Sequence, residues 1–423
     1  MNREETTVKV FVTSEHRFWR TPDGKIWTAG NPSYEFWTRY LSVFDEVVVV
    51  ARVQSVTEQC LGWKMVQGPG VNVLALPGYR GPSEFVRTLP RVRATLMRLA
   101  TEGGGVVLRL PGPVSSLFRR YAVPRGYPFG VELVGDPWDV FSPGAIKHYL
   151  RPLFRQLGVS ICRSECRSAV AVAYVSERQL KGRYPAADGA FTTAYSSIAL
   201  DADHFAPRAR TYSEDMTYCK KIIMVGSLEH GYKGVDVLLT AMRDVVDRIP
   251  DSSLTIVGDG IYRASLERQA ELLGIADRVR FLGHLPAGEQ VRRQLDQAAL
   301  FVLPSRAEGL PRAMIEAMAR ALPCIGTKVG GIPELLPEED MVPRDDAAAL
   351  AEAIVSVLSD AQRMSMMSAR NLQVAQAYRS DILQERRKAF YWEVRRRTEE
   401  WLSARAVRDS ARFAFQPKET TRE

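Results

Sequence analysis

What this 423-residue chain lacks already excludes several classes of protein. Its five cysteines are scattered, odd in number and without a C-x-x-C pair, so we expect reduced thiols in a cytoplasmic protein rather than a disulfide scaffold. No apolar run approaches the roughly 20 residues that a membrane-spanning helix needs. The first residues, MNREETTVKV, are charged where a signal peptide would be apolar, so export is not expected.

Signals for metal or dinucleotide binding are also weak. The five histidines are dispersed, and none pairs with another at metal-ligand spacing. No G-x-G-x-x-G follows an expected strand, because the GDG tripeptide at 258–260 stops after two glycines and is typical of a turn. Asp201-Ala202-Asp203 has the D-x-D form of a metal motif but lies in a polar linker. We therefore expect no bound metal and no cofactor.

The charge that is present is basic, with 57 Lys+Arg against 49 Asp+Glu and a net charge of +8. This leaves nucleic acid, an anionic membrane or a phosphorylated ligand as partners. No nucleic-acid-binding module is recognisable, so nucleic acid is disfavoured. Between Glu84 and Glu102, arginines alternate with apolar residues, which is typical either of a helix that contacts anionic lipid or of a solvated helix face. The arginines are Arg87, Arg91, Arg93 and Arg98.

Short β-branched runs alternate with amphipathic segments along the chain. Most runs are continuously apolar, as in strands covered on both faces, and the pattern occurs on both sides of a polar linker at 201–215. The sequence therefore predicts an α/β fold with two Rossmann-like domains. The expected strands cover 8–12, 46–51, 71–76, 105–110, 131–134, 169–175, 221–225, 253–257, 278–282, 300–303 and 323–326, and the clearest helices cover 235–246, 264–273 and 312–321.

The segment 304–336 carries the most informative polar residues. It follows an expected strand and continues into a helix near Pro311, so Glu308 should lie at the carboxyl end of that strand, where open α/β sheets bind ligands. The first backbone N–H groups of such a helix suit a phosphate. Glu316 follows eight residues later and could accept hydrogen bonds from sugar hydroxyls. Taken alone, two glutamates at this spacing are better explained as a loop residue and a solvated helix residue.

The whole segment resembles a known signature. E-G-L-P-x-x-x-x-E is similar to the E-x7-E motif of retaining glycosyltransferases of family 4, which have the GT-B fold. VGSLEHGYKGVDVLLTA, LTIVGDG, RVRFLGHLP and TKVGGIPELL resemble other parts of that family in its order, and the likeness covers about residues 173–351. The resemblance implies two Rossmann-like domains facing each other across a cleft. It also implies a nucleotide-diphosphate sugar, such as a UDP- or GDP-sugar, as the donor.

The resemblance also implies how the chain is divided. Residues 1–205 would form the N-terminal acceptor-binding domain, and residues 206–385 would form the C-terminal donor-binding domain. Residues 386–405 would form a helix that returns to the N-terminal domain, and 406–423 a flexible tail.

Roles for individual residues follow from the same resemblance. Glu308 would contact the donor sugar, Glu316 the ribose, and Lys233 would neutralise the departing diphosphate. For Lys233 the alternative is a surface lysine at a helix start. His284 follows a strand end, and either lies near the base or is a plain loop residue. The donor-binding residues implied are Gly30, Gly226, Ser227, Lys233, His284, Gly309, Leu310 and Glu316.

Two positions depart from the family's pattern. Ser227 stands where the family usually has an arginine, so that positive charge would be absent or supplied from elsewhere, for example by Arg306 or Arg312. Asp136 stands near the place of a histidine that faces the reacting centre. It could orient or deprotonate the acceptor hydroxyl and so act as a catalytic residue beside Glu308 and Lys233, or it could simply form a turn before a proline.

The sequence thus predicts a retaining hexosyl-type glycosyltransferase in bacterial glycan, glycolipid or natural-product biosynthesis. The acceptor would be a glycan, a lipid-linked sugar or a small molecule, and the enzyme would be cytoplasmic, with peripheral contact to the inner face of the membrane left open. The alternatives are a nucleotide-sugar epimerase on the same fold and a non-catalytic sugar-nucleotide-binding protein.

Overall fold

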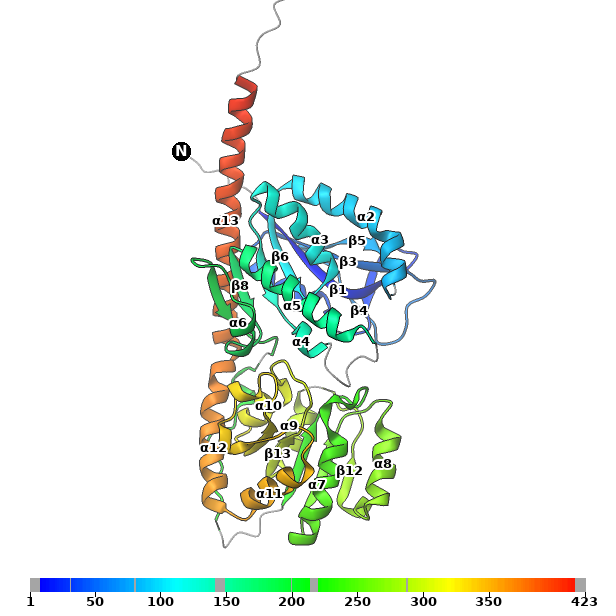
Figure 1. Cartoon of the computed structure of the whole chain (residues 1–423), viewed down its shortest axis with the longest axis vertical. Coiled ribbons are helices and arrows are strands. Elements are labelled where there is room, and N and C mark those ends of the chain that lie inside the picture. Colours follow the sequence, from blue (N-terminus) through cyan, green and yellow to red (C-terminus); the bar gives the residue numbers. More distant parts are fainter. Residues whose placement is uncertain are drawn as a thin grey trace, which may run out of the picture.

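The computed structural model describes residues 8–30, 32–79, 81–140, 149–198, 200–213, 220–286 and 288–414. Two α/β domains are stacked along the long axis, and one long helix follows the side of the upper domain (Figure 1). Within these residues, no helix combines the length and the apolar character required to cross a bilayer. The described cysteines are free, and Cys219 lies outside the described residues.

The first sheet belongs to the N-terminal domain. Its parallel strands pair in the order β5-β3-β1-β6-β7-β8-β9, and two short antiparallel strands, β2 and β4, extend it beside β1. The strands are β1 (Lys9–Arg20), β2 (Ile26–Thr28), β3 (Glu46–Ser55), β4 (Lys64–Met65), β5 (Val71–Pro77), β6 (Gly105–Leu110), β7 (Gly130–Leu133), β8 (Ala171–Tyr174) and β9 (Phe191–Ala194).

The second sheet is entirely parallel, in the order β12-β11-β10-β13-β14-β15. Numbered within the domain this order is 3-2-1-4-5-6, which is the order of a doubly wound Rossmann sheet. The predicted α/β class with two Rossmann-like domains is therefore confirmed. The strands are β10 (Lys221–Val225), β11 (Ser253–Val257), β12 (Val279–Phe281), β13 (Leu300–Leu303), β14 (Cys324–Thr327) and β15 (Met341–Val342).

Helices cover both sheets. Those of the N-terminal domain are α1 (Tyr34–Thr38), α2 (Gly81–Glu102), α3 (Pro113–Ala122), α4 (Pro137–Val140), α5 (Arg151–Ser168) and α6 (Gln179–Arg183). Those that follow are α7 (Val235–Arg248), α8 (Arg263–Leu272), α9 (Glu289–Asp296), α10 (Arg312–Ala319), α11 (Ala347–Leu358), α12 (Ala361–Ala375) and α13 (Ser380–Ala414).

The last helix, α13, returns from the C-terminal domain to the first sheet. It is longer than the segment 386–405 expected for it, because it begins at Ser380 and continues to Ala414. The tail predicted at 406–423 is therefore helical up to Ala414, and residues 415–423 lie outside the described residues. Gly130 of β7 allows the close contact, since a Cβ there would lie 2.5 Å from Val394 and 2.8 Å from Phe390.

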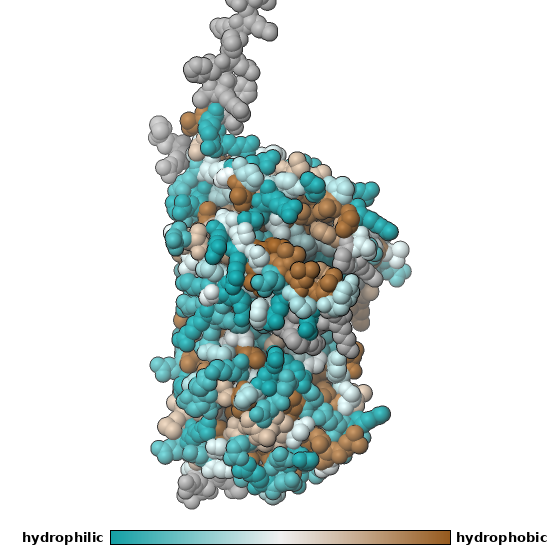
Figure 2. Space-filling model, viewed as in Figure 1, coloured by the Kyte–Doolittle hydropathy of each residue, from teal (hydrophilic) through white to brown (hydrophobic). Residues whose placement is uncertain are grey.

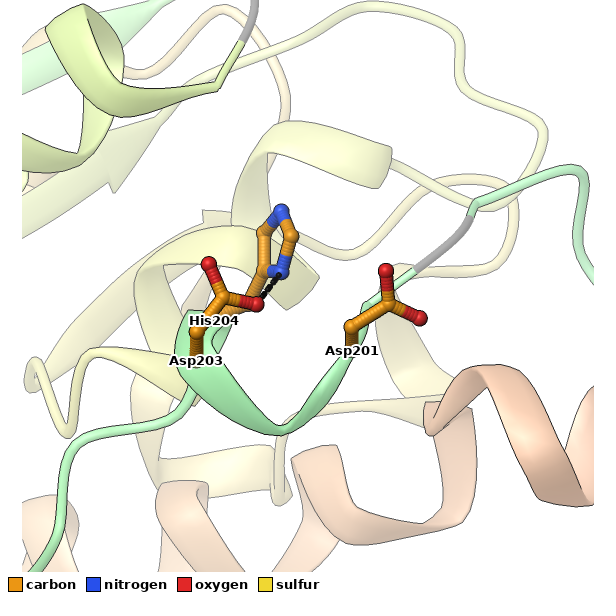
Figure 3. A group of neighbouring side chains, drawn as sticks. All are labelled: Asp201, Asp203 and His204. Carbon is orange, nitrogen blue, oxygen red and sulfur yellow. Dashed lines mark hydrogen bonds and ion pairs between the residues drawn. The ribbon is translucent and has the colours of Figure 1, made fainter.

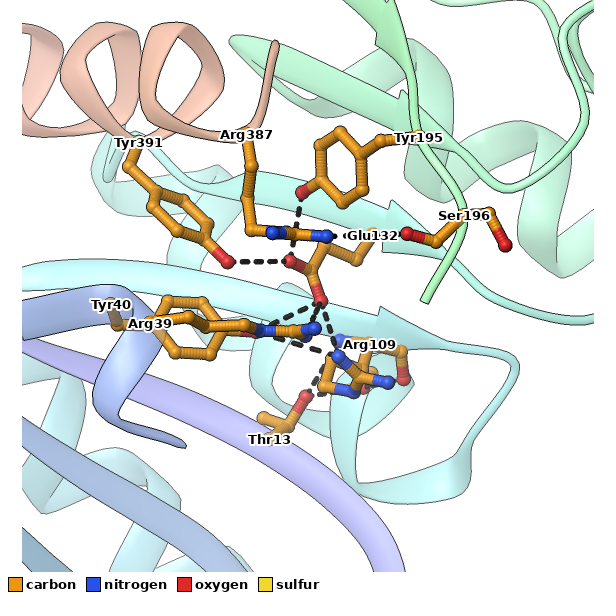
Figure 4. A network of polar contacts seen from close by, with 10 residues as sticks. Thr13, Arg39, Tyr40, Arg109, Glu132, Tyr195, Ser196, Arg387 and Tyr391 are labelled. Carbon is orange, nitrogen blue, oxygen red and sulfur yellow. Dashed lines mark hydrogen bonds and ion pairs between the residues drawn. The ribbon is translucent and has the colours of Figure 1, made fainter. Parts of the chain in front are cut away.

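A buried carboxylate links α13 to the strands of the N-terminal domain (Figure 4). Glu132 of β7 accepts hydrogen bonds from Tyr195 at 2.8 Å, Tyr391 of α13 at 3.3 Å and Tyr40 at 2.9 Å. Burial opposes the charge on Glu132, but the attraction of Arg109 and Arg39 outweighs it and lowers the pKa of Glu132 to about 2. The helix is thus attached by a fully charged, fully hydrogen-bonded group.

The arginine-rich segment forms α2, whose apolar side packs into the core of the N-terminal domain. Val92, Leu96 and Leu99 are buried in the domain core, and the four arginines lie on the exposed side of the helix. Arg93 donates a hydrogen bond to Tyr121 of α3 at 2.9 Å, and Arg98 pairs with Glu102 at 3.6 Å.

One carboxylate of the C-terminal domain binds the N-terminal domain directly. Glu334, after β14, accepts hydrogen bonds from Ser176 Oγ at 2.7 Å and from the backbone N–H groups of Glu177, Arg178 and Gln179 at 2.8 to 2.9 Å. These donors precede and begin α6, whose first N–H groups have no helical acceptor. The contact therefore fixes one edge of the space between the two domains.

We expect the stability of the N-terminal domain to depend on the ionisation of Glu165 in α5. Burial raises the pKa of Glu165 from 4.5 to about 7, so the folded protein binds more protons than the unfolded chain between these values. Stability therefore falls as the pH rises from 4.5 to 7 and stays lower above it, by about 3 kcal/mol. Glu165→Gln should remove this loss.

Thermal unfolding at pH 5 and pH 8 measures the effect. Glu165→Gln should exceed the wild type in melting temperature at pH 8 and approach it at pH 5. Glu271→Gln, at an exposed position of α8, should follow the wild type at both values. Equal pH dependence of the wild type and Glu165→Gln would contradict this account.

Loss of the Glu334 carboxylate should loosen the two domains. Glu334→Ala removes four hydrogen bonds across the interface, and we expect the arrangement of the domains to be weakened by about 1–3 kcal/mol. The radius of gyration from small-angle X-ray scattering should increase. Glu338→Ala is the matched control, because Glu338 is exposed and pairs with Lys328 of its own domain. Indistinguishable scattering from the two variants would refute the role of Glu334.

Candidate functional site

The two segments that carry the sequence motifs meet at one edge of the second sheet. Strands β10 and β13 are neighbours, and the order of the sheet reverses between them, so the loops at their carboxyl ends converge. Lys233 comes from the loop after β10, and its Nζ lies 2.5 Å from Glu308 Oε1 in the loop after β13. Ser305 Oγ donates to the same oxygen at 2.6 Å. Lys233 and Glu308 thus form a largely buried charged pair.

Close backbone packing holds this pair in place. The side-chain stem of Lys233 passes over Gly226, where a Cβ would lie 3.3 Å from Lys233 Cε. Gly330 adopts φ +54° beneath the Glu308 loop, and a Cβ there would lie 1.9 Å from the Glu308 carbonyl oxygen. The N–H of Gly331 donates to the carbonyl oxygen of Gly309 at 2.7 Å. The GG dipeptide of TKVGGIPELL therefore positions the loop that carries Glu308.

The N-terminus of α10 lies beside the Lys233–Glu308 pair. The helix begins at Arg312 after Pro311, and no side chain caps it. Among the described residues, the backbone N–H groups of Gly309 and Leu310 have no hydrogen-bond partner. Glu316 lies within α10 and is half-buried, and burial raises its pKa. The structure thus brings Lys233, Glu308 and the two amides together at one edge of the sheet, while Glu316 lies about one turn further along α10.

The charge missing at Ser227 is not replaced by Arg306. The Arg306 guanidinium pairs with Asp236 at 2.7 Å and with Asp345 at 2.5 Å, and hydrogen bonding to Asp236 raises its pKa. Arg312 is exposed at the start of α10 and pairs with no described carboxylate. Of the two arginines considered from the sequence, Arg312 is therefore the one whose charge is not already neutralised.

Two predicted donor-binding residues lie apart from this cluster. His284 is exposed after β12, at the edge of the sheet, two strands away from β10. Gly30 is exposed after β2, with open space where a Cβ would be. The structure records no contact of either residue with the Lys233–Glu308 pair within its described part, so both roles stay predictions.

A cavity of about 660 Å³ lies between the two domains. Its walls combine α4, α5 and α6 of the N-terminal domain with the loops after β13, β14 and β15 of the C-terminal domain. Gly330, which underlies Glu308, is part of the wall, so the motif loop lies directly behind the cavity. The charged lining residues are Asp139, Arg155, Arg178, Arg183, Arg306, Lys328, Glu334 and Arg344.

Asp136 is buried just behind this cavity. Its Oδ1 accepts hydrogen bonds from the Trp138 N–H at 2.8 Å and from the Tyr184 hydroxyl, and its Oδ2 pairs with Arg183. The bond to Trp138 starts α4, as expected of a turn-forming aspartate. Asp139 reaches the cavity instead, and burial together with the charge of Asp136 raises the pKa of Asp139 to about 6.

The D-x-D sequence does bring potential ligands together (Figure 3). Ligand atoms of Asp201, Asp203 and His204 lie within 4.8 Å of one another. His204 Nδ1 already contacts Asp203 at 3.0 Å, and Arg292 pairs with the other Asp203 oxygen at 3.2 Å. Two of the three candidate ligands, Asp203 and His204, therefore already have partners within the protein.

Sequence reasoning missed several residues that line or close the cavity. Asp139 lies three residues after Asp136 in the same PWD turn, but the sequence alone did not separate the two carboxylates. Arg155 lies on a helix with no motif, and Arg183 lies in AYVSERQLKGRYP, a segment that resembles the end of the family's N-terminal domain but to which no role was assigned. Glu334 lies inside TKVGGIPELL, and its bond across the interface had no local signal.

Known proteins resemble both the sequence and the structure. Residues 219–360 match the family model described as glycosyl transferases group 1. Protein CapJ of Staphylococcus aureus is 24% identical over 78% of this chain and 82% of its own. A GDP-mannose-dependent alpha-(1-6)-phosphatidylinositol monomannoside mannosyltransferase of Mycolicibacterium smegmatis is 27% identical over 74% of this chain and 87% of its own.

Solved structures share the fold. Sucrose-phosphate synthase of Thermosynechococcus elongatus aligns with a TM-score of 0.66 and 19% identity over 92% of this chain and 99% of its own. Anabaena HepE in complex with UDP aligns with a TM-score of 0.61 and 14% identity over 90% and 98%. The chain is therefore a glycosyltransferase with the GT-B fold, whose residues 219–360 correspond to a group 1 glycosyltransferase domain.

Proposed function

We propose that this protein transfers a sugar from a nucleotide-diphosphate sugar to an acceptor hydroxyl with retention of the anomeric configuration, as the resemblance to family 4 implies. The observation that carries the proposal is the Lys233–Glu308 pair beside the uncapped start of α10. A cation, free amides and a carboxylate are the groups needed by a diphosphate joined to a sugar.

The donor would lie along the carboxyl edge of the second sheet. The Gly309 and Leu310 amides and Lys233 would bind the diphosphate, Glu308 the sugar and Glu316 the ribose. Gly226 and Ser227 lie in the same loop as Lys233. Gly30 and His284 would approach the donor only once it is bound. UDP is bound in the HepE structure, and the mycobacterial relative is named for GDP-mannose, which supports a UDP- or GDP-sugar.

The acceptor would enter the cavity from the N-terminal domain. Asp139 faces the cavity and, when charged, can accept a hydrogen bond from the attacking hydroxyl. Asp136, whose oxygens already accept hydrogen bonds within the protein, would hold α4 in place and raise the pKa of Asp139 through its negative charge.

We propose same-face attack, in which the departing phosphate takes the hydroxyl proton and Lys233 stabilises the negative charge that develops on that phosphate. Closure of the domains would exclude water.

The setting proposed is the biosynthesis of bacterial glycans, glycolipids or natural products, in a cytoplasmic enzyme that contacts the membrane peripherally. Arg87, Arg91, Arg93 and Arg98 project from α2 as a basic face, which would attract an anionic membrane surface. A nucleotide-sugar epimerase would release a rearranged sugar, and a non-catalytic binding protein would release no nucleotide.

Replacing the central carboxylate should reduce turnover without unfolding the protein. Glu308→Gln keeps the shape of the side chain but removes the charge that pairs with Lys233, so release of nucleoside diphosphate should fall roughly tenfold or more. Glu352→Gln is the matched control, because Glu352 forms an exposed pair with Arg248 on the surface. Incubation with UDP-, GDP- and ADP-sugars and product mass spectrometry measures both.

The outcome separates the alternatives. A free rearranged sugar would identify an epimerase, and a melting-temperature rise with a nucleotide sugar but no product with any acceptor would indicate a binding protein. No melting-temperature rise with any of the donors would refute donor binding, and unchanged turnover in Glu308→Gln would refute the assigned site.

The pH profile of transfer should report Asp139. The charged form accepts the hydrogen bond of the acceptor, so the rate should fall as the pH drops below about 6, where this carboxyl takes up a proton. Asp139→Asn should slow transfer and abolish the fall in rate below about pH 6. Asp136→Asn should move that fall to lower pH, because it removes the neighbouring negative charge that raises the pKa of Asp139. If the rate of Asp139→Asn still falls near pH 6, Asp139 is not the group whose protonation causes the fall.

A further inference from the structure

A small cavity lies in the N-terminal domain beside the buried Glu132 cluster. It has a volume of about 80 Å³, and its walls are the carboxyl ends of β7 and β8, the loop after β9, and two arginines. These are Arg39, which follows α1, and Arg109 of β6. A single water needs roughly 10–15 Å³ of such space, so the cavity has room for a small polar group of several atoms.

The protein itself uses only part of the hydrogen-bonding capacity of these two arginines. Both contact the same carboxylate through one nitrogen each, since Arg109 Nη1 lies 2.5 Å and Arg39 Nη2 lies 3.4 Å from Glu132 Oε2 (Figure 4). Arg39 Nε is buried and has no hydrogen-bond partner among the described residues. Because a guanidinium carries several N–H donors, most of the donors of this pair remain available to a ligand.

Positive charge exceeds negative charge around the cavity. Figure 4 shows a third guanidinium, that of Arg387 of α13, on the opposite side of Glu132, where it donates a hydrogen bond to the Ser196 carbonyl oxygen at 3.2 Å. Arg387 forms no ion pair with any residue that the structure describes. One carboxylate is thus surrounded by three cations, although one cation is enough to neutralise it. The surplus charge favours an anion in the cavity.

Aromatic packing fixes the orientation of the two arginines that line the cavity. The centroid of the Phe36 ring in α1 lies 3.7 Å from Arg39 Cζ and 4.8 Å from Arg109 Cζ. The two arginine side chains remain 16% and 14% exposed, so a ligand can reach them. A ligand would find both guanidinium groups already positioned, which reduces the entropy lost on binding.

The cavity lies on the side of the N-terminal domain that faces the donor loops. A neighbouring cavity of about 150 Å³ shares Val175 and Ser196 with it and extends to Leu310 of the C-terminal domain. Val134 lines the smaller cavity, and Asp139 in the α4 turn that follows lines the large cavity between the domains. The surface at this junction is mainly hydrophilic beside α6 and α13 (Figure 2). The rest of a ligand held here would therefore lie between the two domains.

We propose that Arg39 and Arg109 bind a carboxylate or phosphate group of the acceptor, so that the enzyme glycosylates an acidic acceptor. Planar guanidinium groups bind both of these oxyanions with paired hydrogen bonds. The inference deepens the proposed function and rests on it for one point, that the molecule carrying the anionic group is the acceptor of the transfer. Binding of the anion would fix the position of the acceptor and direct its hydroxyl toward Asp139 and the donor sugar.

The melting temperature in sodium phosphate or sodium acetate, compared with sodium chloride of the same ionic strength, tests the site. Lys233→Gln serves as the background, because it removes the cation with which phosphate would pair at the donor loops. In this background about 20 mM of phosphate or acetate should raise the melting temperature by roughly 2 °C. Adding Arg39→Gln should abolish the rise, while Glu132 keeps its contact with Arg109.

The matched pair of variants is Val134→Glu and Val134→Gln in the same background. Val134 is 46% exposed at the edge of the cavity, so either side chain can be accommodated, and the two differ in charge. Val134→Glu places a carboxylate beside the arginines and should abolish the rise, whereas Val134→Gln should keep it. A rise with phosphate alone assigns a phosphate group, and a rise with acetate alone assigns a carboxylate.

Two results of this experiment would overturn the site. One is that neither anion raises the melting temperature of the Lys233→Gln background. The other is that Val134→Glu and Val134→Gln respond equally, because the anions would then act through the solvent or at another place.

Transfer to glucose, glucuronate and glucose 6-phosphate tests the role of the site in the reaction. In Val134→Gln alone, kcat/KM for the acidic sugar that the site prefers should exceed that for glucose roughly tenfold or more. In Val134→Glu the two values should become similar. Equal transfer to neutral and acidic sugars in Val134→Gln would overturn the acceptor role.

The inference and the proposed function fail separately. Anion binding that depends on Arg39, without any response to nucleotide sugars, would refute only the transfer reaction. Donor-dependent melting and nucleotide release, without anion binding at this cavity, would refute only the acidic acceptor.

Discussion

Parallel pairing makes all strands of the second sheet end at the same edge, and the reversal of strand order between β10 and β13 separates the helices that follow. Two loops that are about 75 residues apart in sequence thereby meet, and Lys233 reaches Glu308. Gly330 is a consequence of this meeting, because the backbone of the Glu308 loop lies closer to it than a Cβ would allow, and Gly226 leaves room for the Lys233 side chain. The donor edge therefore depends on the sheet topology before it depends on any side chain.

The second requirement is that two separate sheets hold one cavity between them. The helix α13 is attached to the first sheet through the buried Glu132 cluster, and Glu334 binds the start of α6 from the other domain. Both contacts join segments that are more than 150 residues apart. A carboxylate is used each time, because a charged acceptor forms stronger hydrogen bonds to hydroxyl and amide donors than a neutral one does.

The distribution of charge and apolar surface shows what a sequence pattern leaves open. The arginines between Glu84 and Glu102 fitted either a membrane-contacting helix or a solvated face, and the structure adds that the apolar side of α2 packs on its own sheet, so only the arginines are exposed. In α5 the apolar residues are spread around the helix, so periodicity gave no clear face. Only the packing of Cys162 and Cys166 on the sheet reveals that Leu153 and Leu157 point away from it.

The sequence by itself determined the buried strands and the motif loop. Continuous apolar runs such as Lys221–Val225 can only be covered on both faces, and the E-x7-E segment is local enough to be read directly. Short or polar strands such as Phe191–Ala194 were missed, because their pairing rather than their composition makes them strands. The tertiary structure alone decided that Arg306 is neutralised by Asp236, that Asp139 rather than Asp136 reaches the cavity, and that Glu334 joins the domains. Each of these depends on which distant groups share a buried space, and a linear pattern of residues carries no distances.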